Sequence, residues 1–241
     1  MKKFWEVKQS SVAGVAEIFI YGPIVSFKWD DEDTTASSFQ KDLKALGDVD
    51  SINLHINSPG GSVFEGIAIG NMLKHHKAHV TAYVDALAAS IASVIVASCD
   101  EVIMPENSML MIHNPMLGIF GNANELRKTA DDLDKIAESS VITYLSKAGD
   151  QLTEEKIKQI MDEETWMSAQ EAFEIGLCDS VIVSNQMVAA INEDLFQHYQ
   201  SVPERLMTVN QSSTADKEIR ERLLKEAQQN NALIGAILGG I

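Results

Sequence analysis

The sequence predicts a mixed α/β domain. Short runs of β-branched and apolar residues alternate with stretches whose apolar side chains recur at helical spacing, from residue 14 to about residue 183. This alternation is typical of a sheet whose strands are joined by helices, and right-handed crossovers bring the connecting loops to a common edge. We place this domain at residues 1–185 of the 241 and assign residues 186–241 to a tail with a linker and a helix.

Strands are expected where short β-branched or alternating apolar runs are bounded by glycine, proline or polar turn residues. The first such stretch reads as two short strands, one on each side of the turn at Gly22-Pro23. The strand before Asn57 alternates polar and apolar residues, which indicates one buried face, whereas the strand before His113 is apolar throughout. In chain order, the expected strands cover residues 14–27, 51–56, 80–84, 101–104 and 109–112.

Helices are expected between these strands, where apolar residues recur every three or four positions. Ser37 and Gln40 have the spacing of a capping box at the start of the first helix, and Gly47 ends it. The helix around Ser90 consists largely of small residues, and the longest helix has one apolar face and ends before Gly149. In chain order, the expected helices cover residues 37–46, 63–75, 88–98 and 124–147, with one more at 217–228 in the tail.

Composition narrows the classes of function. The formal net charge of -16 opposes binding to a polyanion, so no nucleic acid is expected as a partner. Cys99 and Cys178 are far apart and lack metal-ligand spacing, which favours neither a disulfide framework nor a metal site. The start of the chain lacks the apolar segment of a signal peptide, and no apolar stretch reaches the roughly 20 residues of a membrane-spanning helix. We therefore expect a cytoplasmic protein that does not span a membrane.

The sequence offers the groups that amide hydrolysis needs: a nucleophile, a base, an acid that orients the base, and N–H donors for the oxyanion. Ser90 stands among small residues where a strand gives way to a helix, so backbone N–H groups are expected beside its hydroxyl. His113 ends an apolar strand, from which its imidazole projects at the sheet edge. Close helix packing around Ser90 and a structural histidine at 113 are the competing interpretations of each residue taken alone.

The acid and the oxyanion donors have more than one candidate. Asp162 and Glu164 stand two residues apart, so on an extended segment both side chains face the same way, and either fits beside His113. A solvated acidic turn is the alternative interpretation of these residues. Gly60 and Gly61 allow backbone N–H groups to approach a ligand closely at a strand-to-helix turn, although a tight turn alone also explains them.

Five segments resemble the proteolytic subunit of the Clp protease family in order and spacing: residues 56–61, 88–90, 111–115, 166–172 and 176–179. The resemblance covers residues 16 to 183 and implies a crotonase-like fold of repeated ββα units. It also implies that Ser90 is the nucleophile and His113 its base. The implied oxyanion donors are the backbone N–H groups of Gly60, with Gly61 as a further candidate, and of Ile91.

The sequence departs from the family at the third member of the triad. Glu164 aligns with an aspartate of the family, so the acid is one methylene longer, and Asp162 is kept as the alternative. The short segment before the first strand is unlike the family's axial loop, and with the added tail it resembles Clp-like peptidases of phages and prophages. That resemblance implies processing of capsid or scaffold proteins.

The expected activity is that of a serine endopeptidase acting on protein or peptide substrates, with no metal or organic cofactor. The long helix after His113 corresponds to the family's interlocking element, which implies a homo-oligomeric ring, with a heptamer or double ring as the expected form. Docking of an AAA+ unfoldase is left open. Two alternatives also stay open: a crotonase-fold acyl-CoA hydratase or isomerase, and a non-catalytic head-assembly scaffold.

Overall fold

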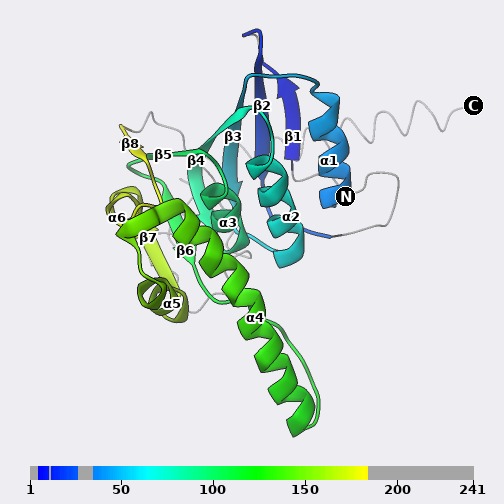
Figure 1. Ribbon diagram of the computed structural model, residues 1–241, viewed down its shortest axis with the longest axis vertical. Coiled ribbons are helices and arrows are strands. Elements are labelled where there is room, and N and C mark those ends of the chain that lie inside the picture. Colours follow the sequence, from blue (N-terminus) through cyan, green and yellow to red (C-terminus); the bar gives the residue numbers. More distant parts are fainter. Residues whose placement is uncertain (1–4, 11, 27–34, 184–241) are drawn as a thin grey trace, which may run out of the picture. The chain divides into compact units, whose positions relative to one another are not determined.

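An eight-stranded sheet forms the frame of the described chain in a computed structural model that describes residues 5–10, 12–26 and 35–183 (Figure 1). The expected tail, with its linker and helix, lies outside the described residues. The strands are β1 (Trp5–Gln9), β2 (Val15–Tyr21), β3 (Ser51–Ser58), β4 (His79–Ala89), β5 (Glu101–Pro105), β6 (Met109–Ile112), β7 (Thr165–Ser168) and β8 (Ser180–Ile182).

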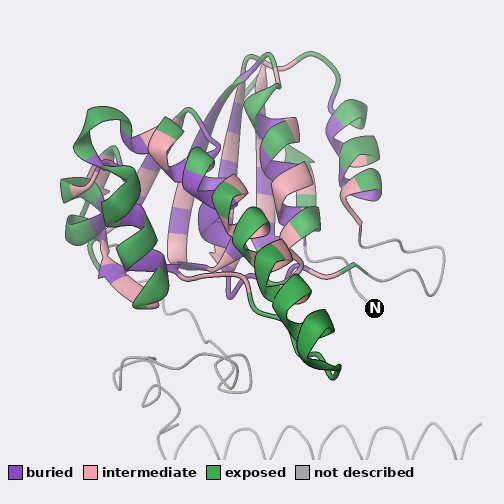
Figure 2. Cartoon of the chain, turned by 60° about the horizontal axis from the view of Figure 1, so that its bottom comes forward, coloured by how far each residue is buried: buried purple, intermediate pink, exposed green. Residues whose placement is uncertain are grey.

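Helices cover one face of this sheet (Figures 1 and 2). On β3 the side chains of Ile52, Leu54 and Ile56 are buried against them, while Asn53 and His55 on the opposite face are only half-buried. This period of two is what a strand with one buried face requires. The helices are α1 (Ala36–Ala45), α2 (Val63–Lys74), α3 (Ile91–Ala97), α4 (Ala123–Ala148), a 3-10 turn at Gly149–Gln151, α5 (Glu154–Asp162) and α6 (Ala169–Glu174).

The long strand β4 divides the sheet. Its first half pairs with β5 and its last three residues pair with β6, both in parallel. The main path of the sheet runs β1-β2-β3-β4-β5-β8, and β7 pairs with β6 away from that path. The pairings of β1 with β2 and of β6 with β7 are antiparallel, and the other pairings are parallel. The end of β4 therefore lies beside β6, and β6 lies between β4 and β7.

Helix α3 packs directly behind this fork. All seven of its residues are buried, which explains why the stretch consists of small and apolar residues. Helix α4 is different along its length: its last turns are buried, with Val141 and Tyr144 in the core, whereas its first turns extend past the sheet and are exposed (Figure 2). The helix is therefore anchored at one end only within the described residues.

The mixed α/β class is confirmed, and the expected strands at 51–56, 80–84, 101–104 and 109–112 all lie within observed strands. The expected helices at 63–75 and 124–147 agree with α2 and α4 to within two residues.

Of the two strands expected around Gly22-Pro23, the first is confirmed as β2, whereas the second does not form among the described residues 24–26. β2 ends at Tyr21, and Gly22, with a φ of 94°, turns the chain so that Ile24 makes only an isolated bridge to Gly61. The antiparallel partner of β2 is instead the upstream strand β1. The first helix is also capped by Thr35, whose hydroxyl accepts from the Ser38 N–H, rather than by Ser37.

The expected start of a helix at Ala88 is wrong as well. Ala88 and Ala89 continue β4, because they pair with Leu110 and Met111 of β6, and this pairing outweighs the helix propensity of alanine. Helix α3 begins only at Ile91. Five further strands and α-helices were not expected from the sequence: β1, β7, β8, α5 and α6.

Across residues 5–10, 12–26 and 35–183, no helix is both long and apolar enough to cross a membrane. Over the same ranges, no cluster of three or more His, Cys, Asp or Glu side chains is arranged to hold a metal ion.

Candidate active site

Ser90 lies in the one-residue gap between β4 and α3. Its backbone has a φ of 56° and a ψ of -130°, which is uncommon for a residue with a side chain. The Ser90 N–H donates to the carbonyl of Met111 in β6 at 2.9 Å. Such a backbone conformation costs of order 1–3 kcal/mol and persists only where the surroundings fix it, and residues of this kind cluster at functional sites.

His113 is brought to Ser90 by the pairing of β4 with β6. Because Ala89 lies opposite Met111, the residues that follow the two strands emerge at the same edge. The His113 Nε2 atom lies 2.7 Å from the Ser90 Oγ atom, a normal hydrogen-bond distance. The two residues that the sequence singled out 23 positions apart are therefore in contact.

The surroundings of His113 favour its neutral form. Burial lowers the pKa of His113 below its ordinary value, because a charged imidazolium is poorly solvated there. The carboxylate of Glu164 opposes this effect and raises the pKa by Coulomb attraction. A neutral imidazole at neutral pH is the form that can accept a proton from a hydroxyl.

Glu164 faces His113 across the pairing of β6 with β7. Ile112 lies opposite Thr165 in this antiparallel pair, so one step further along each strand the register places His113 opposite Glu164. The φ of Glu164 is 48°, and it is therefore positive like the φ of Ser90. The carboxylate is thus close enough to act on the imidazole by Coulomb attraction, although Glu164 is separated from His113 by 51 positions in the sequence.

Asp162 does not share an extended segment with Glu164, and that expectation is wrong. Asp162 is the last residue of α5, and Glu163 caps the helix, so the chain turns sharply between the two acids. The cause is the cap at Thr153, whose hydroxyl accepts from the Lys156 N–H and starts a helix where none was expected. The Asp162 Oδ1 atom instead accepts a hydrogen bond from the Asn114 side chain at 2.7 Å.

Gly60 packs against Ser90. A methyl group at Gly60 would lie 2.6 Å from the Ser90 Cβ atom and 3.2 Å from the Ile91 nitrogen, so a side chain at Gly60 has no room. Its N–H donates to the Ser58 hydroxyl at 3.1 Å. Gly61 is an exposed residue, and its N–H donates to no other described residue. Ile91 opens α3, so its N–H has no acceptor within the helix.

A shallow hollow of about 330 Å³ adjoins this group of residues. It lies between α4 and α5, and one of its lining residues is Asn114, which directly follows His113. Its lining is mainly acidic and apolar, comprising Asn114, Asp134, Ala137, Glu138, Val141, Lys158 and Asp162.

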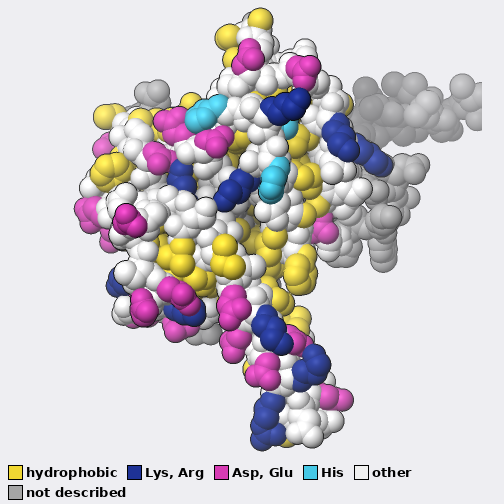
Figure 3. Space-filling view, in the orientation of Figure 1, with side chains coloured by type: hydrophobic (Ala, Val, Ile, Leu, Met, Phe, Trp, Pro, Cys, Tyr) yellow, Lys and Arg dark blue, Asp and Glu magenta, His cyan; other side chains and the backbone are white. Residues whose placement is uncertain are grey.

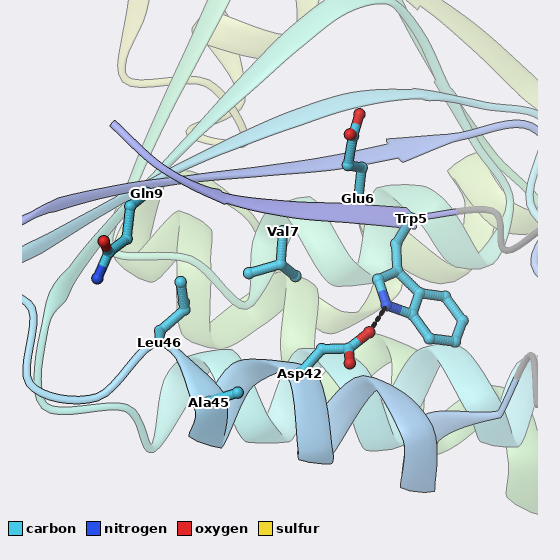
Figure 4. A pocket seen from close by; sticks show the side chains of 7 residues that line it. All are labelled: Trp5, Glu6, Val7, Gln9, Asp42, Ala45 and Leu46. Carbon is cyan, nitrogen blue, oxygen red and sulfur yellow. Dashed lines mark hydrogen bonds between the residues drawn. The ribbon is translucent and has the colours of Figure 1, made fainter. Parts of the chain in front are cut away.

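A second hollow, of about 420 Å³, lies between β1 and α1 (Figure 4). The Trp5 indole points into it and donates to the Asp42 carboxylate at 2.8 Å. None of the residues predicted to be catalytic lines this hollow.

Two hydroxyl residues near Ser90 were not singled out from the sequence. Ser93 lies one helical turn after Ser90, and its hydroxyl contacts both the Ser90 carbonyl and the Tyr144 hydroxyl. The signal for Ser93 was its spacing of three residues from Ser90, whereas the polar end of Tyr144 had no signal, because its apolar ring fits the buried face of α4.

Known proteins match the region that contains these residues. The family model described as Clp protease matches residues 9–185. An ATP-dependent Clp protease proteolytic subunit of Bacteroides fragilis (strain ATCC 25285) is 34% identical over 158 residues, which is 63% of this chain and 75% of that protein. The subunit of Streptococcus pneumoniae (strain 70585) is 35% identical over 185 residues, 70% of this chain and 86% of that protein. The proteolytic subunit 1 of Protochlamydia amoebophila is 38% identical over 133 residues, 54% of this chain and 64% of that protein.

The matched region includes Ser90, His113 and Glu164, and the mixed α/β architecture agrees with the crotonase-like fold expected from the resemblance. The chain belongs to the Clp protease family of serine peptidases.

Proposed function

We propose that this protein is a serine endopeptidase in which Ser90 is the nucleophile and His113 its base. The observation that supports this role is the 2.7 Å contact between the His113 Nε2 atom and the Ser90 Oγ atom. In the proposed reaction, His113 accepts the hydroxyl proton as Oγ bonds to the peptide carbonyl carbon. His113 then gives that proton to the departing amine, and an ester to Ser90 remains.

Hydrolysis of the ester repeats the sequence with water in place of the serine hydroxyl. His113 takes a proton from water, the water oxygen bonds to the acyl carbon, and the proton returns to Ser90 Oγ as the acid departs. The residues described here suffice for these steps, and the proposal calls on no metal or organic cofactor.

We assign the third role to Glu164, with Asp162 as the alternative. Continuing the register of β6 and β7 by one residue places Glu164 opposite His113, and the charge of Glu164 raises the pKa of the imidazole. A carboxylate in this place holds the imidazole in the productive tautomer and stabilises the imidazolium that forms. Asp162 is bonded to Asn114, which supports Glu164 over Asp162.

The oxyanion donors in this proposal are the N–H groups of Ile91 and Gly61. Gly60 was the first candidate, but its N–H donates to Ser58 Oγ, so we assign Gly60 the role of leaving space beside Ser90. Hydrogen-bond donors held ready for the developing negative charge are a large part of catalysis in this class of enzyme.

The test combines covalent labelling with proteolysis. Purified protein should react with a fluorophosphonate at Ser90 and should cleave an unfolded protein such as reduced casein, whereas Ser90→Ala should do neither. Ser98→Ala, which removes the buried serine hydroxyl at the opposite end of α3, should keep both activities. Casein cleavage that persists in Ser90→Ala would exclude the proposed nucleophile.

The same test separates the two alternative functions. A crotonase-fold hydratase or isomerase needs no nucleophile, so it would resist the fluorophosphonate. A non-catalytic scaffold would be inert to casein as well, and the close approach of His113 to Ser90 gives no support to a decayed site. Both alternatives therefore predict results opposite to those of the serine peptidase.

We further propose that the protein acts as a homo-oligomer and that its physiological substrates are capsid or scaffold proteins of a phage or prophage. Three relatives are named as subunits of an ATP-dependent protease, which supports an oligomer; the substrate class rests on the sequence resemblance alone. When Ser90→Ala replaces the parent protein in the native host, those virion proteins should remain uncleaved. Mass spectrometry of the virion proteins would detect this. Processing that continues unchanged would remove this substrate class.

Casein cleavage with and without ATP and an AAA+ unfoldase would decide whether such a partner is needed.

A further inference from the structure

The carbonyl of Ser90 is held from inside the core. It accepts from the Ser93 N–H at 2.9 Å and from the Ser93 hydroxyl at 2.5 Å. The Ser93 hydroxyl oxygen in turn lies 2.7 Å from the hydroxyl of Tyr144 in α4. Ser93 is fully buried and Tyr144 is 2% exposed, so water does not compete for these bonds.

The direction of the hydrogen bonds follows from the groups involved. A carbonyl has no hydrogen, so the contact between the Ser93 hydroxyl and the Ser90 carbonyl requires Ser93 to donate. Ser93 has a single hydroxyl hydrogen, so this donation leaves its hydroxyl with no hydrogen to donate to Tyr144. Tyr144 must therefore donate to Ser93, and the three residues form a chain that runs from Tyr144 to the Ser90 carbonyl.

The Ser90 carbonyl and the Ile91 N–H belong to the same peptide group. That group is planar, and in the trans form its C=O and N–H point in opposite directions. Fixing the carbonyl inside the core therefore also fixes the direction of the Ile91 N–H on the other side. This constraint matters because the φ of Ser90 is 56°, a conformation that the chain does not favour by itself.

We propose that Ser93 and Tyr144 are positioning residues that aim the Ile91 N–H at the oxyanion through the peptide group between Ser90 and Ile91. This inference rests on the proposed peptidase function and adds two residues that do not touch the substrate. It differs from simple packing, because it depends on the two hydroxyl groups and not on the bulk of the side chains.

The test removes each hydroxyl with the smallest possible change of shape. Ser93→Ala and Tyr144→Phe delete one link each, and Ser98→Ala is the matched control. Ser98 lies at the other end of α3, and its hydroxyl donates to the Val94 carbonyl at 2.8 Å without any link to Ser90. A fluorogenic peptide amide gives kcat and KM, and thermal unfolding shows that each variant is folded.

Deleting an oxyanion donor costs about 10²- to 10³-fold in kcat, and a donor that is displaced should cost less, about tenfold. Both Ser93→Ala and Tyr144→Phe should therefore lower kcat about tenfold with little change in KM, and the double variant should be no worse than the stronger single variant. A peptide boronic acid places an oxygen where the oxyanion forms, so its inhibition constant should rise by the same factor as kcat falls. The acid limb of kcat/KM, which reports His113, should not move.

Three results would overturn the inference: kcat values of both variants within twofold of the parent, an equal loss in Ser98→Ala, or a loss accompanied by a shifted acid limb. The last result would place the effect on His113 and not on the Ile91 N–H. If the parent protein itself neither cleaves the peptide nor reacts with a fluorophosphonate at Ser90, the proposed function fails instead, so the two failures are distinguishable.

Discussion

The two acidic residues near His113 differ in the partners that hold them. Asp162 belongs to the end of α5 and accepts a hydrogen bond from the amide of Asn114. Glu164 lies past the helix, where the register of β6 and β7 brings it opposite His113 and its charge acts on the imidazole. Glu164 has a positive φ of 48° and stands between the end of α5 and the first residue of β7. An additional methylene relative to aspartate is compatible with a carboxylate that approaches from this turn.

Replacing Glu164 by glutamine should impair catalysis much more than the same change at Asp162. An amide can neither stabilise the imidazolium nor enforce its tautomer, and loss of a triad carboxylate costs up to about 10⁴-fold in kcat. We expect Glu164→Gln to lower kcat by about 10²- to 10⁴-fold and Asp162→Asn to stay within about fivefold of the parent, measured with a fluorogenic peptide. The reverse order of the two variants would transfer the role to Asp162.

The pH dependence of activity should report the environment of His113. Activity needs the neutral imidazole, so kcat/KM should rise with pH through the pKa of His113, and burial places this acid limb below the range of an ordinary histidine. Glu164 raises that pKa by favouring the charged form. Glu164→Gln should therefore shift the acid limb to still lower pH. A shift to higher pH in this variant would contradict the assigned interaction, and Asp162→Asn is the control.

The meeting of β4 with β6 explains how much of the site the sequence could predict. The strand ending at His113 was predicted and is confirmed, since its four residues are all apolar and all buried. Ser90 was predicted at a helix start, and it does precede α3, although β4 ends at Ala89 and so takes up the first two residues of the expected helix. Local patterns describe each element but do not encode which strands pair. The contact between the two residues was therefore expected only through the family resemblance.

Helix α5 is the opposite case, because the local sequence does contain the features of a helix. Thr153 precedes Glu154 and Glu155, and Ile157, Ile160 and Met161 follow at helical spacing and are buried. An N-cap, acidic first-turn residues and an apolar stripe together predict a helix. The acids at its end were instead interpreted as an extended segment. The positive φ of Glu164 has no such signal, because glutamate rarely adopts it.

The turn between β3 and α2 leads to a prediction about Gly60. A side chain at Gly60 would collide with Ser90, whereas one at Gly47 would meet no atom within 4 Å, and both glycines have a positive φ. Gly47→Ala should lower the free energy of unfolding by about 1–3 kcal/mol through the strained backbone, and Gly60→Ala should lower it further, because its methyl group also collides with Ser90. Only Gly60→Ala should also lose fluorophosphonate labelling of Ser90. Equal labelling of the two folded variants would show that the space beside Ser90 is not needed.

Exposed apolar side chains lie in the segment just before helix α4 and in its first turn, near the end that extends past the sheet. Charged side chains of both signs lie along this part of the helix in Figure 3. Phe120, just before the helix, is fully exposed, and its neighbours add to an apolar surface. Large exposed apolar patches mark interaction sites in soluble proteins. The apolar segment comprises Met116, Leu117, Ile119, Phe120 and Leu126.

A charge within this apolar segment should weaken assembly of the protein. Burying a phenylalanine side chain contributes roughly 1.5–3 kcal/mol, and in an oligomer each subunit would contribute one such contact. Phe120→Glu replaces that gain with the cost of burying a carboxylate, so it should sediment as a smaller species than the parent at equal concentration. Phe173→Glu, at another exposed phenylalanine in α6, is the control and should sediment like the parent. An unchanged sedimentation coefficient for folded Phe120→Glu would show that the oligomer forms through another surface.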